Sequence, residues 1–147
     1  MTLGDAVKTG VLTFNGAGTL TAATTLTVAS GVVLGGALSG AFGLTKAGSG
    51  ELTLGGANTF TGNTTVNAGT LTVSGGNAIG DGTTVTLATS GSLKLSGSEE
   101  IGVLTASGTG TVNLQGNVLT IGGSGASSVG VVVSGAGGSV VRTGLGR

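Results

Sequence analysis

The chain has 147 residues with five acidic and five basic side chains, and 73 of its residues are Gly, Thr or Ser. It contains no His and no Cys, which excludes an imidazole base, a thiol nucleophile, a disulfide and an ordinary zinc site. Zero net charge gives no electrostatic footprint for nucleic acid, and the positive mean hydropathy of +0.53 argues against disorder. We therefore expect neither an enzyme nor a protein that depends on a cofactor.

Short segments in which apolar residues alternate with Thr, Lys or Asn recur along the chain. They cover residues 11–14, 19–21, 26–28, 52–54, 71–73, 85–87, 93–95, 112–114 and 119–121. This alternation is typical of half-buried strands, so apolar members such as Leu54 and Leu71 should point inward. Turns rich in Gly, Ser and Asn separate the segments, as at 55–58 and 74–77. No apolar stripe of helical period is present and Gly disfavours helices, so we expect no substantial helix.

The sequence also contains a longer repeat, each copy of which spans several of these short segments. Residues 16–20 match residues 108–112 at an offset of 92, and residues 46–50 match residues 142–146 at an offset of 96. An offset that drifts by single residues fits strands that keep their register while turns absorb insertions. We interpret residues 1–147 as a single segment with about one and a half copies of a 92–96-residue unit, and we expect it to be an excerpt of a longer array.

Short, evenly spaced strands with small side chains favour a β-solenoid, in which each turn of the chain stacks on the previous one. At about 20–25 residues per turn, roughly six or seven rungs would form a rod about 30 Å long. An antiparallel sandwich is the competing fold, but it normally has several large core residues, and this chain has only three Phe. We therefore predict an all-β fold, a parallel β-helix or β-solenoid.

Residues 43–73 closely resemble the autotransporter-associated β-strand repeat, which occurs in the passenger regions of bacterial autotransporters and related large surface proteins. The matching features are Gly43-Leu44-Thr45-Lys46, the Gly48-x-Gly50 turn, Leu52-Thr53-Leu54, Asn58-Thr59-Phe60-Thr61-Gly62, Thr64-Thr65-Val66 and Ala68-Gly69-Thr70-Leu71. Family members more often have Tyr at the position of Phe60. The resemblance implies a right-handed parallel β-helix that is secreted or displayed on the surface of a Gram-negative cell. It implies a scaffold and no activity of its own.

The sequence shows neither a secretory signal peptide nor a run of 18 apolar residues. The alternating ten-residue strands and aromatic girdles of a membrane barrel are not evident either. We therefore expect no membrane insertion by this segment.

Three groups of residues invite a site interpretation, and each has a simpler one. The Gly-x-Gly pairs at 16–18 and 108–110 lack the third Gly and the following helix of a dinucleotide-binding loop, so we interpret them as turns. Asp81 lies one place late for a calcium-binding nonapeptide that has no second copy, so we interpret it as a turn residue. Glu99 and Glu100 are neighbours that would face opposite sides of a strand and could not act as an acid–base couple. We interpret them as a solvated turn.

A Ser–Lys dyad is the remaining arrangement that could activate a hydroxyl nucleophile, because the chain has no His. Nothing in the sequence marks such a dyad. We therefore predict no catalytic, cofactor-binding or metal-binding residue.

Basic residues recur at one point of the repeat, since Lys8, Lys46 and Arg142 each stand two residues before a Gly. A row of ligand-binding cations is one interpretation. We favour common repeat ancestry combined with solubility, because exposed Lys discourages the pairing of strand edges.

Thr-x-Thr pairs also recur, and a flat face of such pairs is what ice-binding β-solenoids present. The pairs lie at 19–21, 25–27, 59–61, 70–72, 84–86 and 109–111. Their irregular spacing argues against one stacked array, so we interpret them as ordinary outward strand residues. Ice or ligand binding through outward Thr rows is a minor alternative.

Two functional hypotheses of different classes follow. The first is a non-catalytic structural stalk or scaffold segment of a secreted or surface-displayed passenger, whose partners are neighbouring repeats of the same protein. The second is an extracellular fibre subunit that associates end to end, since open solenoid ends expose unpaired strand edges. Adhesion to a surface or host ligand rests on the family resemblance alone.

Overall fold

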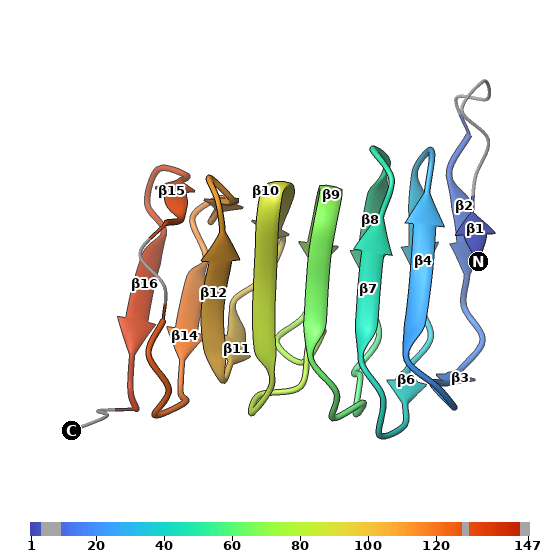
Figure 1. Ribbon diagram of the computed structural model, residues 1–147, viewed down its shortest axis with the longest axis horizontal. Helices are drawn as coiled ribbons and strands as arrows, with labels where there is room; N and C mark the ends of the chain where they lie inside the picture. The colour runs from blue at the N-terminus through green and yellow to red at the C-terminus, as the bar shows by residue number, and fades with distance from the viewer. Residues whose placement is uncertain (4–9, 128–129, 145–147) are drawn as a thin grey trace.

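The computed structural model describes residues 1–3, 10–127 and 130–144. These residues form sixteen strands and no helix, so none of their elements is a helix long and apolar enough to cross a membrane. Every strand pairing is parallel, and the turns of the chain stack along the long axis of the molecule from the N-terminal to the C-terminal end (Figure 1). The prediction of an all-β parallel β-solenoid is confirmed.

The strands belong to three sheets. The eleven-stranded sheet contains β1 (Thr2–Leu3), β2 (Leu12–Phe14), β4 (Thr24–Val28), β5 (Val32–Leu34), β7 (Leu44–Ala47), β8 (Glu51–Leu54), β9 (Thr64–Val73), β10 (Thr84–Leu95), β12 (Val103–Ser107), β13 (Thr111–Asn113) and β15 (Val132–Ser134). The three-stranded sheet contains β11 (Glu99–Ile101), β14 (Val118–Ile121) and β16 (Ser139–Arg142). The two-stranded sheet contains β3 (Gly18–Thr19) and β6 (Leu38–Ser39).

One inward column of aliphatic side chains runs through the molecule and defines its turns. Its members are Leu12, Val32, Leu52, Leu71, Leu93, Val112 and Val133. Successive members are separated by 20, 20, 19, 22, 19 and 21 residues, which gives six turns. At about 4.8 Å per step, the column is about 29 Å long. The predicted number of rungs is confirmed, and a turn is at the short end of the predicted length.

The core consists almost entirely of Val, Leu, Ile and Ala from alternate strand positions. In β8, for example, Leu52 and Leu54 are fully buried while Glu51 and Thr53 are partly exposed. Leu71 is also fully buried, so the predicted inward orientation of Leu54 and Leu71 is confirmed. Burying one such side chain contributes about 1.5–3 kcal/mol, and the small aliphatic groups suit the narrow interior of a solenoid.

Two strands, of 10 and 12 residues, are much longer than the three to five residues predicted. β9 and β10 each continue through a corner, so that the segments 85–87 and 93–95 are parts of one strand rather than separate strands. Gly makes this possible, because Gly69 has a φ of 68° and a Cβ at Gly91 would collide with the carbonyl oxygen of Val66. The pairing of β9 with β10 shifts register between Leu87 and Ser90 at this corner.

Candidate functional site

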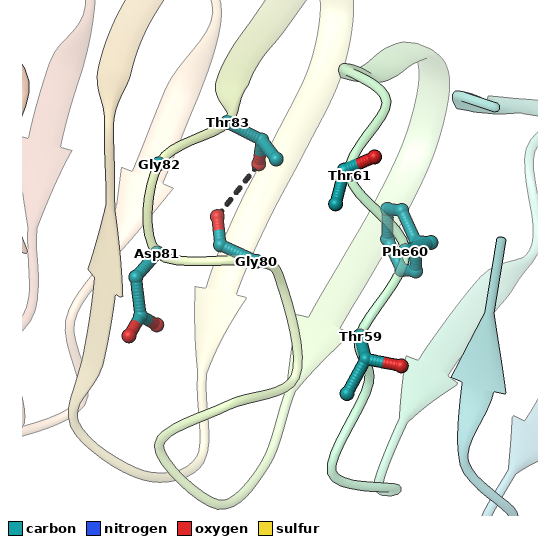
Figure 2. Close-up of a pocket in the computed structure, with 7 residues that line it drawn as sticks. All are labelled: Thr59, Phe60, Thr61, Gly80, Asp81, Gly82 and Thr83. Atoms are coloured by element: carbon teal, nitrogen blue, oxygen red, sulfur yellow. Dashed lines mark hydrogen bonds between the residues drawn. The ribbon is translucent and has the colours of Figure 1, made fainter. Parts of the chain in front are cut away.

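A groove of about 280 Å³ lies between two successive turns of the chain, beside the turn that contains Asp81. Residues 59–61 form one wall and residues 80–83 form the other (Figure 2). The Thr83 hydroxyl donates to the carbonyl oxygen of Gly80 at 2.8 Å and so closes the turn. Figure 2 shows the Asp81 carboxylate directed away from residues 59–61. The prediction that Asp81 is a turn residue is confirmed.

The groove contains few polar side chains that could bind a ligand. Its polar groups are the hydroxyls of Thr59, Thr61 and Thr83 and one carboxylate, and Phe60 is fully buried behind it. Across the described ranges, no three His, Cys, Asp or Glu side chains are grouped so that they could hold a metal ion. The Gly-x-Gly pairs at 16–18 and 108–110 are not followed by a helix. Gly16 and Gly108 lie at bends, as the interpretation as turns requires, whereas Gly18 begins strand β3, so that interpretation is only partly correct for 16–18.

The acidic pair is not a solvated turn, which corrects the sequence interpretation. Glu99 and Glu100 lie in β11, with Glu99 only 3% exposed and Glu100 exposed on the opposite side. The two side chains face opposite sides, as predicted, but the residues belong to strand β11 where a turn was expected. The Glu99 carboxylate accepts hydrogen bonds from the backbone N–H of Ile79 at 2.6 Å and of Ala78 at 3.3 Å.

Burial raises the pKa of the Glu99 carboxyl above its ordinary value. The two backbone N–H bonds act in the opposite direction, and the nearby carboxylate of Asp81 adds to the increase. No basic side chain hydrogen-bonds or ion-pairs with Glu99 among the described residues. A buried acid with a raised pKa can act as a general acid, but the Glu99 carboxylate is engaged by the backbone N–H groups of Ala78 and Ile79.

The second correction concerns Lys46, which was expected to serve solubility at the surface. It lies in β7 between Leu26 and Val66 of an inward column and is fully buried. Its ammonium donates to the carbonyl oxygens of Gly48 and Ala68, both at 2.9 Å, and to that of Ala47 at 3.4 Å. Burial lowers the pKa of Lys46. The three N–H groups of the ammonium therefore have three backbone acceptors and no carboxylate.

Arg142 repeats part of this geometry at the C-terminal end. Its Nε donates to the carbonyl oxygen of Gly144 at 3.2 Å, and its Nη2 donates to that of Gly125 at 2.6 Å. Lys46 and Arg142 thus each bond the carbonyl two residues ahead and a carbonyl on a neighbouring turn. The recurring cation therefore satisfies corner carbonyls at both described positions. Lys8, the third member of the pattern, lies outside the described residues.

Lys94 is the basic side chain that faces outward as its strand pattern predicts. Its Nζ lies 3.4 Å from the Glu51 carboxylate, two turns away, and Thr72 on the turn between them donates to the same oxygen at 2.5 Å. The Thr72 hydroxyl holds the pKa of Glu51 below its ordinary value; burial opposes this effect, and Lys94 adds to the decrease. Neither Lys46 nor Lys94 hydrogen-bonds a Ser or Thr hydroxyl, so the described residues contain no assembled Ser–Lys dyad.

The Thr-x-Thr pairs do not stack as pairs, as predicted from their spacing. One column of single threonines does stack, however, which the spacing of the pairs did not reveal. Its members are Thr25, Thr45, Thr65, Thr86 and Thr105. The hydroxyls of Thr86 and Thr105 are 2.9 Å apart, so adjacent turns are linked by cross-strand hydrogen bonds. Residues next to this column include Ala47 and Asn63, so no second Thr column completes a flat array. Ice binding stays a minor alternative.

Comparison with protein families supports the sequence resemblance. Residues 44–73 match the passenger-associated-transport-repeat family, and this range coincides with the segment that resembled the autotransporter-associated repeat. Searches of curated proteins and of solved structures gave no significant match. The matched range runs from the start of β7 to the end of β9, one and a half turns that include Lys46 and Asn58. Residues 44–73 of this chain are therefore similar to a passenger-associated transport repeat, and they lie within a β-solenoid.

Proposed function

We propose that this segment is a non-catalytic, rigid stalk of a secreted or surface-displayed passenger of the autotransporter type. The observation that carries the proposal is the unbroken inward column from Leu12 to Val133, in which each turn pairs in register with the next. Each further turn of such a column lengthens the rod by about 4.8 Å, so a longer chain gives a longer rod. The passenger repeat at 44–73 supports a location outside the cell.

Distance measurements between spin labels test the stalk directly. Thr13 and Ser134 are exposed members of one outward column and are separated by six turns. The chain has no Cys of its own, so Cys variants at these two positions can be labelled selectively. The distances between the two spin labels should form a narrow distribution centred at about 29 Å, increased by the length of the two label side chains. Deletion of residues 32–51, which joins Gly31 to the equivalent of Val32, should shorten the distance by about 5 Å.

A broad distance distribution, or a deletion variant whose distance does not shorten, would contradict the stalk. In the whole protein, a spacer should also tolerate the deletion with reduced reach. A binding or catalytic function carried by residues 32–51 would instead be lost with them.

End-to-end assembly is the second candidate, and exposed core side chains at both end turns favour it. Leu12 and Val133 are 42% and 49% exposed, whereas the five members of their column between them are at most 1% exposed. The N-terminal end also contains an apolar hollow of about 280 Å³, lined by the exposed Phe14 and by core residues such as Leu20 and Leu38. Stacking the C-terminal turn of one copy on the N-terminal turn of another would continue the parallel pairing and bury both surfaces.

Two substitutions in β15 separate this candidate from a monomeric stalk. Val133→Lys places a charge in the column that a second copy would cover, while Val132→Lys places the same charge on the outward side of the same strand. If assembly occurs through the ends, electron microscopy and sedimentation should show filaments that Val133→Lys abolishes and Val132→Lys retains. A parent chain that stays monomeric at high concentration, or filaments that survive Val133→Lys, would contradict it.

A further inference from the structure

The aliphatic columns leave the stacking order of the turns underdetermined. Leu52, Leu71 and Leu93 occupy the same column, and each is followed two residues later by another aliphatic side chain. A turn that skipped its neighbour and paired with the next one would still place apolar groups inside. A shift by one residue is prevented by the alternation of inward and outward positions, but a skipped turn is not. Something other than hydrophobic burial must select the native stacking.

Three buried polar side chains make hydrogen bonds between neighbouring turns of the native stacking. Lys46, Asn58 and Glu99 are at most 4% exposed, and each hydrogen-bonds the backbone of a different turn. We call them the interior polar residues. Lys46 reaches Ala68, 22 residues ahead, and Glu99 reaches Ala78, 21 residues back.

Asn58 is the centre of this arrangement because its amide bonds in both directions. Its Oδ1 accepts from the N–H of Leu38 at 2.7 Å, 20 residues back, and its Nδ2 donates to the carbonyl oxygen of Ala78 at 2.7 Å, 20 residues ahead. Glu99 then accepts from the N–H of the same Ala78. Four successive turns, at Leu38, Asn58, Ala78 and Glu99, are thus joined by one chain of side-chain-to-backbone bonds.

We propose that the interior polar residues are register determinants, which specify which turn stacks on which. In a skipped or shifted stacking, their amide, carboxylate and ammonium groups would be buried without partners, and the backbone groups that they satisfy would lose theirs. The same groups contribute little net stability in the native stacking, because burying them has its own cost. A single buried polar residue sets register in this way in coiled coils.

Cross-linking between two introduced Cys residues measures the register directly, because the chain has no native Cys that could also react. Thr45 and Thr65 are paired neighbours about 4.8 Å apart, whereas Thr45 and Thr86 are two turns apart at about 9.6 Å. Two double-Cys reporters, Thr45→Cys/Thr65→Cys and Thr45→Cys/Thr86→Cys, are refolded and treated with a bifunctional thiol reagent that spans one turn only. In the parent chain, the first pair should cross-link and the second should not.

The test replaces the interior polar residues by apolar side chains of similar size, as Lys46→Met, Asn58→Leu and Glu99→Met. The proposal predicts that the triple variant increases cross-linking of the 45/86 pair at least ten-fold over the parent and reduces that of the 45/65 pair. Lys94→Met is the matched control, since it removes an outward lysine from the same kind of strand and should change neither yield.

Native-only cross-linking in a folded triple variant would overturn the proposal. Should the triple variant lose its β-sheet circular dichroism, Lys46→Met and Glu99→Met are assayed singly, and each should raise the 45/86 product. Folded single variants with native-only products overturn the proposal as well. Unfolding of both single variants, with Lys94→Met folded, would also overturn it, because the groups would then supply stability instead of selecting among registers.

Discussion

Thr64 offers a sharp test of how the interior is packed, because its hydroxyl is buried without a hydrogen-bond partner among the residues that the structure describes. The side chain is fully buried in β9, between Leu44 and Val85 of the neighbouring turns. Val has the same β-branched shape and replaces the hydroxyl by a methyl group. We therefore expect Thr64→Val to stabilise the protein.

The magnitude follows from the two groups exchanged. A buried hydroxyl without a partner costs about 1–3 kcal/mol relative to an apolar group, and the shape change is minimal. An increase of about 1–2 kcal/mol in the free energy of unfolding corresponds to a melting temperature higher by about 3–6 °C for a chain of this size. Far-UV circular dichroism during chemical and thermal unfolding measures both quantities, since the chain has no Trp or Tyr for fluorescence.

Two neighbouring threonines provide controls for this substitution. Thr65→Val changes an outward, partly exposed residue and should alter the free energy of unfolding by less than about 0.5 kcal/mol. Thr72→Val removes the hydroxyl that donates to Glu51 and should destabilise by about 1 kcal/mol. A Thr64→Val variant that is no more stable than Thr65→Val would refute the reasoning, because the Thr64 hydroxyl would then have a partner.

Three further predictions concern the core, the buried acid and a corner. Leu71→Asp buries an unpaired charge and should cost several kcal/mol, seen as a lower melting temperature; unchanged melting would show that Leu71 is not inward. Because the raised pKa of Glu99 makes the folded state retain a proton that the unfolded chain releases, the free energy of unfolding should fall as pH rises from its ordinary pKa of 4.5 through the raised value. Subtracting the pH profile of Glu99→Gln isolates this effect, and parallel profiles would disprove it. Gly91→Ala should be strongly destabilising because its Cβ would meet the Val66 carbonyl, whereas Gly82→Ala, which meets nothing within 4 Å, should be nearly neutral in urea unfolding.

The strand pattern was sufficient to predict the fold and the inward aliphatic residues. The same strand pattern also predicts the orientation of Lys46 and Glu99, the two charged side chains that are buried against expectation. Leu44 points inward, so the side chain two residues later in the same strand, Lys46, must do so as well. Ile101 is inward and places Glu99 on the same side. Charged side chains are in general rarely buried, but at these two positions the local alternation prevails over that tendency.

The partners of these side chains could not be predicted in the same way. They are backbone groups about 20 residues away, such as the carbonyl of Ala68 and the N–H of Ile79. Which backbone group lies opposite depends on the length of every intervening corner, and the turns vary between 19 and 22 residues. The continuous strands β9 and β10 have the same origin, since a corner Gly lets the ladder continue where composition indicated a break.

The two interior charges show why such a scaffold can include few of them. Lys46 and Glu99 do not pair with each other. Lys46 is satisfied by backbone carbonyls of its own corner and of the neighbouring turn, and Glu99 by two backbone N–H groups at a bend of the neighbouring turn. Each therefore needs a specific corner conformation in addition to its own burial, and a turn with no such corner would have to leave the charge unpaired. Outward residues such as Thr53 and Lys94 carry no comparable requirement, since solvent can satisfy them. It follows that substitutions which give this rod a binding surface should be tolerated on the outward columns, while errors in stacking should originate at the interior polar residues.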